Sequence, residues 1–162
     1  MAIPDFVIAL REKIGTAPLW LSGVTAVVVK DDQLLLVRRA DNGAWTPVTG
    51  IIDPGEHPAD AAAREVAEEA GVRVVPERLA GVGVTELVVY PNGDESQYID
   101  LTFLMRWVDG EPYPADGENT HVAWFSLDAL PPMSAEMTAR IETALSDSTS
   151  TVYRFGGESF GR

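Results

Sequence analysis

The sequence predicts a domain of the α+β class. Two observations support this prediction: segments rich in β-branched residues flank one central helical segment, and a second helical segment follows near the C-terminus. The chain has 162 residues, the size of one domain, and 46% of them are hydrophobic, which suffices for a sizeable core. We expect this domain to cover residues 1–146, followed by a mobile tail over residues 147–162.

The first part of the chain is typical of a helix followed by a β-hairpin. Residues Asp5 to Ile14 carry apolar side chains at helical spacing, so we expect a short amphipathic helix there. Val24 to Lys30 and Leu34 to Arg38 are apolar runs separated by a short turn, the pattern of two hairpin strands. The segment from Ala40 to Thr49 contains turn-forming residues and is expected to be a loop.

The second part of the chain alternates strand and turn signals. Composition predicts strands over Arg73 to Val75, Leu79 to Tyr90, Tyr98 to Val108 and His121 to Leu127. A turn is expected at Pro91 to Asp94, because the Asn-Gly pair within it readily adopts the left-handed conformations of a hairpin. Two prolines then precede a helix expected over Ser134 to Leu145. The remaining tail is rich in Ser, Thr and Gly, which is why we expect it to be mobile.

The central segment from Gly50 to Val72 reads GIIDPGEHPADAAAREVAEEAGV and is the most informative in the chain. Pro58 is favourable in the first turn of a helix, because the N–H that proline lacks would be unpaired there. The residues that follow, up to Ala70, are mainly Ala and Glu, which are good helix formers. Gly71 is a typical helix C-terminus. The segment therefore predicts a glycine-containing loop that leads into a helix.

Three carboxylates share one face of this helix. At about 100° per residue, Glu65 and Glu69 lie within about 40° of each other, and Glu68 lies about 60° to the other side of Glu65. Like charges at this spacing repel one another. Arg64 can pair with Glu68, but one guanidinium cannot neutralise three carboxylates, whereas a hard divalent cation such as Mg²⁺ can. The alternative interpretation is a solvated acidic helix face.

The fixed residues of this segment resemble the Nudix box, Gly-x5-Glu-x7-Arg-Glu-apolar-x-Glu-Glu-x-Gly-apolar. The matching residues are Gly50, Glu56, Arg64, Glu65, Val66, Glu68, Glu69, Gly71 and Val72. The chain is therefore identified as a member of the Nudix hydrolases, a family that cleaves nucleoside diphosphates linked to another moiety. The resemblance implies an α/β/α sandwich with a mixed β-sheet and a catalytic loop–helix–loop, extending over residues 24–145.

The resemblance also implies roles for individual residues. The metal ligands would be Glu65, Glu68 and Glu69. Arg64 would orient a glutamate through an ion pair, and Glu56 would either join a second metal or steady the loop. The implied reaction is attack of water on one phosphorus of a diphosphate, with Mg²⁺, or Mn²⁺ in its place, neutralising the developing charge. The general base is left open between Glu65 or Glu69 within the box and Glu118 in a later loop.

Candidate substrate-binding residues lie outside the box. Arg38 and Arg39 end a strand just before it and could contact a phosphate, or they could be ordinary surface residues. Tyr90 lies in the downstream region where diadenosine-polyphosphate hydrolases often carry a tyrosine, although a packing role in a strand is the alternative. The aromatic residues that could stack on a base are Trp45, Tyr90, Tyr98 and Phe103.

Composition limits the partners of the chain. The formal net charge of −13 argues against nucleic-acid binding, because phosphate backbones attract basic surfaces. The chain has no cysteine and no apolar stretch long enough to span a bilayer. We therefore expect a cytoplasmic enzyme that acts on a small nucleotide, as a monomer or a homodimer. The alternative is a Nudix-fold module that senses a nucleotide without turnover, although such a module need not keep three repelling carboxylates.

Overall fold

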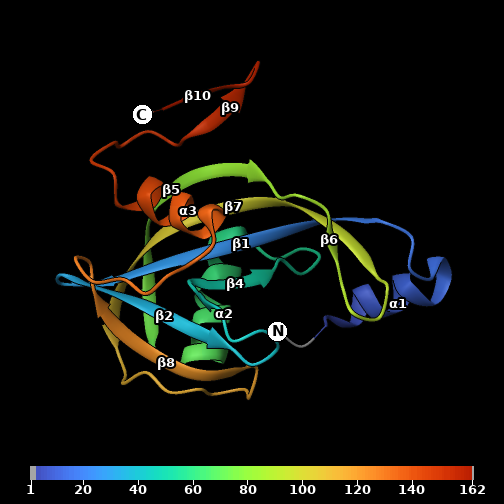
Figure 1. Ribbon diagram of the computed structural model, residues 1–162, viewed down its shortest axis with the longest axis horizontal. Helices are drawn as coiled ribbons and strands as arrows, with labels where there is room; N and C mark the ends of the chain where they lie inside the picture. The colour runs from blue at the N-terminus through green and yellow to red at the C-terminus, as the bar shows by residue number, and fades with distance from the viewer. Residues whose placement is uncertain (1–2, 162) are drawn as a thin grey trace.

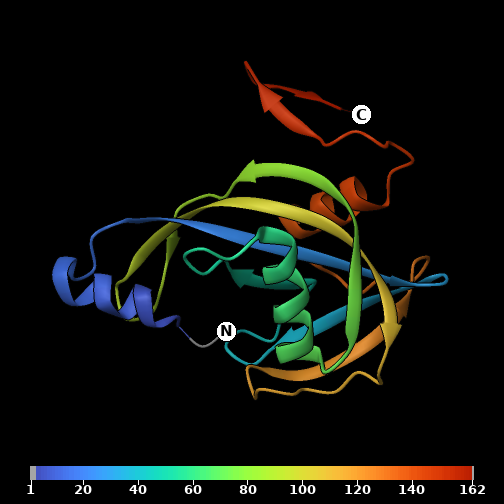
Figure 2. The same cartoon turned by 180° about the vertical axis from the view of Figure 1, so that it is seen from behind.

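A mixed β-sheet with helices on both faces forms the body of the molecule (Figures 1 and 2). This computed structural model describes residues 3–161. The helices in that range are α1 (Asp5–Ile14), α2 (Pro58–Ala70) and α3 (Ala135–Leu145). Helix α3 lies in front of the sheet in Figure 1, and α2 lies in front of it in Figure 2, so the two helices cover opposite faces. None of these helices is long and apolar enough to cross a membrane.

The central strand of the sheet pairs in different directions along its two edges. The strands are β1 (Leu19–Lys30), β2 (Gln33–Arg39), β3 (Trp45–Thr46), β4 (Val48–Ile51), β5 (Arg73–Val84), β6 (Val88–Val89), β7 (Glu95–Asp109), β8 (Asn119–Ser126), β9 (Tyr153–Phe155) and β10 (Glu158–Phe160). One edge of β1 runs parallel to β7. The other edge pairs antiparallel with β4 and then with β2. Strand β4, which leads into the box, is therefore held against the centre of the sheet.

Apolar residues on both faces of β1 explain why helices cover the sheet on both sides. Val24 and Val28 belong to a buried cluster with Val66 of α2. Val27 points to the other face, where it belongs to a cluster with Ile141 of α3. A strand that is buried on both faces is expected to be a nearly continuous apolar run, and this is what the sequence of β1 shows. The predicted α+β class is confirmed.

Several strands differ in length from the predictions. The first strand begins at Leu19 rather than at Val24, because its early residues pair with β7. The strand predicted over Leu79 to Tyr90 is interrupted, because the Thr85 hydroxyl accepts the Tyr98 N–H at 3.0 Å, a position that a backbone carbonyl takes in a regular ladder. The separate strand predicted over residues 73–75 is part of β5, which continues past Pro76 through a register irregularity.

Two segments contain strands that were not predicted. The short strands β3 and β4 lie in the segment around residues 40–51, which was predicted as a loop up to Thr49. In the tail, Val152 exchanges backbone hydrogen bonds with Ala80 and Val82 of β5 at 2.8 and 2.9 Å. Strands β9 and β10 then form a hairpin that projects beyond α3 (Figure 1). Edge-strand backbone groups can pair with almost any sequence, so composition gave no sign of this contact. The mobility of the tail stays a prediction.

Candidate active site

Helix α2 carries the acidic motif and packs closely on the sheet. Pro58 occupies its first turn, and Gly71 ends it with a positive φ of 69°. The side chains that face the sheet are small, and Ala61, Ala62 and Val66 are completely buried. Small residues allow the helix axis to approach the strands. The carboxylates beside this apolar face are consequently drawn into partly buried positions.

The side chain of Glu65 lies in space that Gly50 leaves open. Only 5% of the Glu65 surface is exposed, and a Cβ atom on Gly50 would overlap its carboxyl end. Gly50 lies in β4, where it is opposite Val24 of the central strand, so it cannot move away. The first glycine of the box thus permits a close approach, whereas Gly55 provides a positive φ of 87° in the loop. Burial raises the pKa of Glu65.

Arg64 is shared among three carboxylates. Its Nε and Nη2 atoms donate to the two carboxylate oxygens of Glu56 at 2.8 and 2.9 Å. Its Nη1 atom donates to Glu65 at 3.0 Å and to Glu68 at 3.1 Å. A further bond to the Ile51 carbonyl at 3.1 Å attaches the guanidinium to β4. The predicted ion pair between Arg64 and a box glutamate is present in this geometry.

Glu56 connects the loop to the helix. Besides the paired contact with Arg64, its carboxylate accepts the backbone N–H of Asp53 at 3.2 Å. The hydrogen bond from Arg64 lowers the pKa of Glu56. Of the two roles left open for Glu56, these contacts support steadying the loop, and its role as a metal ligand stays a prediction.

Glu69 is held by a residue that the sequence analysis missed. The Asn119 side chain donates to Glu69 Oε2 at 2.8 Å, and both residues are nearly inaccessible, with 6% and 5% of their surfaces exposed. Burial raises the pKa of Glu69 to about 7, although the hydrogen bond from Asn119 acts in the opposite direction. Fifty positions separate the two residues in the sequence. In the sequence Asn119 lies two residues before the strand predicted over His121 to Leu127, and no local pattern marked it.

An acidic cavity of about 360 Å³ opens beside α2. Its lining residues are Pro4, Asp53, Arg64, Glu65, Glu68, Asp116 and Glu118. Glu68 is the most open of the three box carboxylates, with 55% of its side chain exposed. Glu118, which was predicted as an alternative base, is brought by the fold to the same cavity as Glu65 and Glu68. The cavity therefore collects carboxylates from three separate parts of the chain.

The donor atoms around this cavity fit a hard divalent cation. They are mainly carboxylate oxygens, the ligand type that Mg²⁺ and Mn²⁺ prefer, and the lining contains neither histidine nor cysteine. As they stand, no three acidic, histidine or cysteine side chains among residues 3–161 converge closely enough to hold an ion. The carboxylates of Glu65 and Glu68 turn to Arg64, and that of Glu69 turns to Asn119. Binding a cation therefore requires side-chain rotations on a fixed helix.

Of the two predicted arginines, Arg39 is within electrostatic range of Glu69 of the box. Its guanidinium forms two hydrogen bonds with Asp41, at 3.0 and 2.7 Å. Asp41 raises the pKa of Arg39, and Glu69 and Tyr90 act in the same direction from a longer range. Arg38 is exposed and donates to a backbone carbonyl of the following loop at 3.2 Å. The substrate-binding roles of Arg38, Arg39 and Tyr90 stay predictions.

The predicted stacking residues have other partners in the structure. Phe103 lies in the core with 7% of its surface exposed, so it cannot meet a base. Trp45 packs edge-on against Phe125, with ring centroids 4.8 Å apart. The hydroxyl groups of Tyr90 and Tyr98 are hydrogen-bonded to each other at 2.7 Å. Burial raises the pKa of Tyr90, and the contact with Tyr98 adds to this effect.

The family of the chain follows from a comparison of its sequence with known families. The family model described as the NUDIX domain matches residues 20–145. The chain belongs to the Nudix family. The resemblance predicted from the box at residues 50–72 is thereby confirmed. Helix α1 and the tail lie outside the matched range.

Individual Nudix proteins resemble this chain over most of its length. A MutT-like protein of Streptomyces ambofaciens is 36% identical over 129 residues, which cover 79% of this chain and 78% of that protein. The NAD-capped RNA hydrolase NudC of Pseudomonas aeruginosa is 33% identical over 112 residues. That match covers 68% of this chain but only 37% of NudC, so the chain spans little more than a third of that relative.

Solved Nudix structures share the fold. An ADP-ribose pyrophosphatase from Streptococcus suis superposes with a TM-score of 0.61 at 28% identity, covering 81% of this chain and 96% of that one. A MutT protein from Methanosarcina mazei superposes with a TM-score of 0.64 at 25% identity. The predicted Nudix fold is confirmed. The predicted class of enzyme, a Nudix pyrophosphohydrolase acting on phosphoanhydride bonds, is confirmed as well.

Proposed function

We propose that this Nudix hydrolase cleaves a diphosphate bond in a small nucleotide, with Mg²⁺ as its cofactor and Mn²⁺ as a substitute. The substrate is a nucleoside triphosphate or a nucleoside diphosphate linked to another moiety. The observation that carries the proposal is the acidic cavity beside α2, which Glu65, Glu68 and Glu118 all line. Partly buried carboxylates at this density repel one another, and a divalent cation relieves that repulsion.

Each box residue has a role in this proposal. Glu65, Glu68 and Glu69 hold the cation. Before it binds, Arg64 holds the carboxylates of Glu65 and Glu68, and Asn119 holds that of Glu69. When bound, the cation supplies positive charge for the diphosphate oxygens and lowers the pKa of a water molecule. Glu56 keeps the loop attached to Arg64 and Asp53, so that the cavity keeps its shape.

One of three carboxylates near the cavity accepts the proton of the attacking water. Glu118 lines it directly and has no place among the proposed cation ligands. Glu65 and Glu69 are buried, and burial raises the pKa of both. Replacing Glu118 with Gln distinguishes the candidates. A loss of turnover with cation binding intact assigns the base to Glu118, whereas unchanged turnover assigns it to the box.

The net charge of −13 supports a small substrate rather than a long nucleic acid. Two similar proteins are named an ADP-ribose pyrophosphatase and an NAD-capped RNA hydrolase, and ADP-ribose and NAD both contain a diphosphate. The chain spans only part of the second relative, so the RNA activity of that protein is a separate outcome to be tested. We propose the cytoplasm as the site of action, where small nucleotides are abundant.

The test is a product assay of the purified chain with Mg²⁺. The panel contains nucleoside triphosphates including oxidised ones, ADP-ribose, NAD(H), dinucleoside polyphosphates, nucleotide sugars and a short NAD-capped RNA. Selective turnover of one class, abolished by chelation and restored by Mg²⁺, supports the proposal. Turnover that survives chelation contradicts the metal role.

Two variants separate catalysis from folding. Glu68→Gln and Glu69→Gln keep the size of each side chain but remove its charge, so both should abolish turnover while the chain stays folded. Glu86→Gln, on an exposed segment away from the box, is the matched control and should turn over normally. If the whole panel is silent while the cation still binds, the nucleotide-sensing alternative is favoured.

A further inference from the structure

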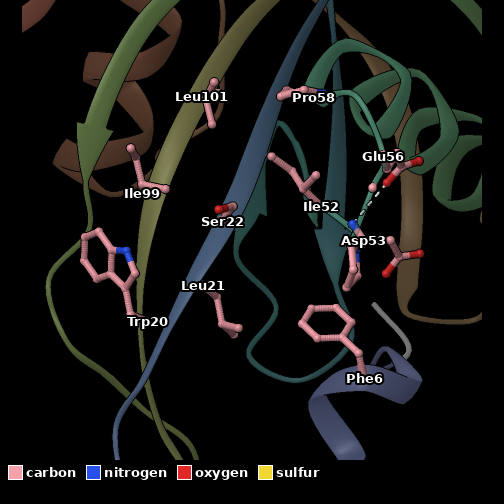
Figure 3. A pocket seen from close by; sticks show the side chains of 12 residues that line it. Phe6, Trp20, Leu21, Ser22, Ile52, Asp53, Glu56, Pro58, Ile99 and Leu101 are labelled. Atoms are coloured by element: carbon pink, nitrogen blue, oxygen red, sulfur yellow. Dashed lines mark hydrogen bonds between the residues drawn. The ribbon is translucent and has the colours of Figure 1, made fainter. Parts of the chain in front are cut away.

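A second hollow, of about 520 Å³, adjoins the loop of the box (Figure 3). Its apolar walls are formed by Phe6, Trp20, Leu21, Ile52, Ile99 and Leu101. Polar groups enter only from one strand and from the box loop, as Ser22, Asp53 and Glu56. Mostly apolar walls with a few polar groups are typical of small-ligand sites, which enclose roughly 300–1,000 Å³.

Two aromatic side chains stand on opposite sides of this hollow. Figure 3 shows Trp20 of β1 on one side and Phe6 of α1 on the other, with Leu21 and Ser22 between them. Trp20 has 58% of its surface exposed, although it is the largest apolar side chain in the lining. The exposed indole ring therefore offers a flat apolar face to the hollow.

The wall that carries Phe6 is firmly attached to the sheet. Val7, the neighbour of Phe6, has 5% of its surface exposed and packs with Leu21 and Ile51. The hollow is therefore bounded by packed elements before any ligand arrives, which lowers the entropic cost of binding.

Arg11 fixes the other end of α1. Its Nη1 atom donates to the Ala17 carbonyl at 2.6 Å, and its Nη2 atom donates to the Glu95 carbonyl at 2.7 Å and to Ser96 Oγ at 3.1 Å. An ion pair with Asp94 at 3.6 Å adds to these contacts. The helix is thereby bound to the strand that also supplies Ile99 and Leu101 to the hollow.

The hollow and the acidic cavity share the box loop. Asp53 lines both of them, and its backbone N–H is held by Glu56, which is itself held by Arg64. The two sites therefore suit a ligand with a flat apolar end, which enters the hollow, and a polyphosphate end, which lies at the acidic cavity. A nucleotide has this composition.

We propose that the hollow binds the base of the nucleotide substrate, which stacks on Trp20 and Phe6. The inference rests on the proposed function, because it places the diphosphate of the same molecule at the acidic cavity. The stacking residues differ from the four aromatic residues predicted from the sequence. Phe6 also lies outside the matched residues 20–145, so α1 adds a wall that the common Nudix segment does not contain.

The first measurement is direct binding of nucleosides to the metal-free chain by calorimetry. Adenosine, guanosine, cytidine and uridine are compared with ribose, which lacks a base. We expect at least one nucleoside to bind measurably and ribose not to bind. Phe6→Ala and Trp20→Ala should each weaken that binding about tenfold, because base stacking on an aromatic ring has an effect of this order. Phe155→Ala, an exposed aromatic in the tail hairpin, is the matched control and should leave it unchanged.

The second measurement is the kinetics of the same variants on the substrate that the panel identifies. KM should rise about tenfold in Phe6→Ala and Trp20→Ala while kcat changes little, because the base is remote from the bond that is cleaved. Arg11→Met, which leaves both rings intact but loosens α1, should raise KM in the same direction. Circular dichroism of each variant checks that the chain is folded.

The outcomes separate the base site from the proposed reaction. Turnover with unchanged KM in both ring variants overturns the base site and leaves the reaction standing. Nucleoside binding that depends on Phe6 and Trp20, without turnover of any nucleotide, supports the base site and counts against the reaction. If no nucleoside binds the wild-type chain better than ribose, the base site is overturned whatever the turnover.

Discussion

At the scale of single residues, the position of Glu65 depends on the absence of a side chain at Gly50. Gly50 is fixed in β4 by its pairing with Val24, and the Glu65 side chain fills the space beside it. The carboxylate can therefore lie against the strand and face Arg64 at the same time. A methyl group at position 50 would force the carboxylate out of this position, even though the backbone could remain unchanged.

We expect Gly50→Ala to lower kcat by at least tenfold, because the displaced Glu65 can no longer take part in the cation site. Overpacking of this kind should also reduce the free energy of unfolding by about 1–3 kcal/mol. Steady-state kinetics and urea denaturation measure the two effects. The matched control is Gly83→Ala, because a Cβ atom at that strand position meets no other atom within 4 Å. Equal kinetics for the two variants would contradict the role of Gly50.

Asn119 should matter for activity although it lies far from the box in sequence. In Asn119→Ala the Glu69 carboxylate loses its buried donor, so we expect weaker Mn²⁺ binding and a decrease in kcat of about tenfold. Asn119→Asp should be more severe, because it places a second carboxylate beside Glu69. Calorimetric titration with Mn²⁺ and steady-state kinetics test both variants. Asn92→Ala, in the exposed hairpin turn, is the control.

The pKa of Glu69 predicts a pH dependence of stability in the metal-free chain. Its folded value of about 7 lies above its unfolded value of about 4.5, so between these two values the folded chain keeps a proton that the unfolded chain releases. The free energy of unfolding should therefore fall as the pH rises through this window. Burial of Glu65 acts in the same direction.

Urea denaturation in the presence of a chelator, repeated across this pH range, measures the dependence on Glu69. Glu69→Gln should flatten the decrease, because glutamine does not titrate. Glu86→Gln should keep the full decrease. A wild-type chain that becomes more stable as the pH rises through the window would contradict the assignment.

Which site residues could be predicted from the sequence depends on how far apart their partners lie. Arg64 and Glu68 are one helical turn apart, so their contact follows from helix geometry. Glu118 was a candidate because it lies in an acidic loop, and the fold does bring it to the cavity. The contact of Asn119 with Glu69 depends on how β8 is placed next to α2, and no local pattern encodes that placement.

At the scale of elements, an arginine of β5 holds the C-terminal end of α3. The Arg78 Nη2 atom donates to the carbonyls of Thr143, Ala144 and Ser146 at 3.3, 2.9 and 3.1 Å. These carbonyls belong to the end of a helix, where no intrahelical N–H is available to them. Strand β5 therefore provides the C-terminal cap of α3.

We expect Arg78→Met to lower the free energy of unfolding by about 2 kcal/mol, because it removes charged hydrogen bonds but keeps an apolar stem. Thermal or urea denaturation measures the change. Arg73→Met is the matched control on the same strand, since the Arg73 side chain is 71% exposed and its ion pair with Asp109 is long, at 3.5 Å. Equal losses in the two variants would mean that the cap contributes nothing specific.

The helices and strands that could be predicted are those whose own residues carry a recognisable pattern. Helix α2 has a proline at its start, a small apolar face and a terminal glycine, and its bounds agree with the prediction. Strands β3 and β4 are too short for a periodic pattern, and they exist because neighbouring strands pair with them. The start of β1 at Leu19 and the contact of Val152 with β5 likewise depend on partners that are distant in sequence.

At the scale of the whole molecule, the net charge of −13 opposes compactness. Part of this charge is concentrated at the acidic cavity, where Arg64 is shared by three carboxylates. A ligand that binds the folded chain and neutralises this region should therefore stabilise the entire molecule.

We expect millimolar Mg²⁺ to raise the melting temperature by more than Na⁺ does at equal ionic strength, because only the divalent ion is held by several carboxylates. Differential scanning calorimetry measures the difference. The excess should disappear in Glu65→Gln and persist in Glu86→Gln. An equal rise with both salts would indicate general screening rather than a site.

The parallel pairing of β1 with β7 also determines the order in which the molecule can form. The pairing runs from Leu19 opposite Ser96 to Val29 opposite Arg106, so the middle of the sheet joins segments from distant parts of the chain. During synthesis, α2 leaves the ribosome before β7 has been made. At that stage only part of the sheet that packs against the apolar face of the helix is present. Such non-local contacts slow folding. The Glu69 carboxylate, which Asn119 holds, reaches its final arrangement later still, after β8 has been made.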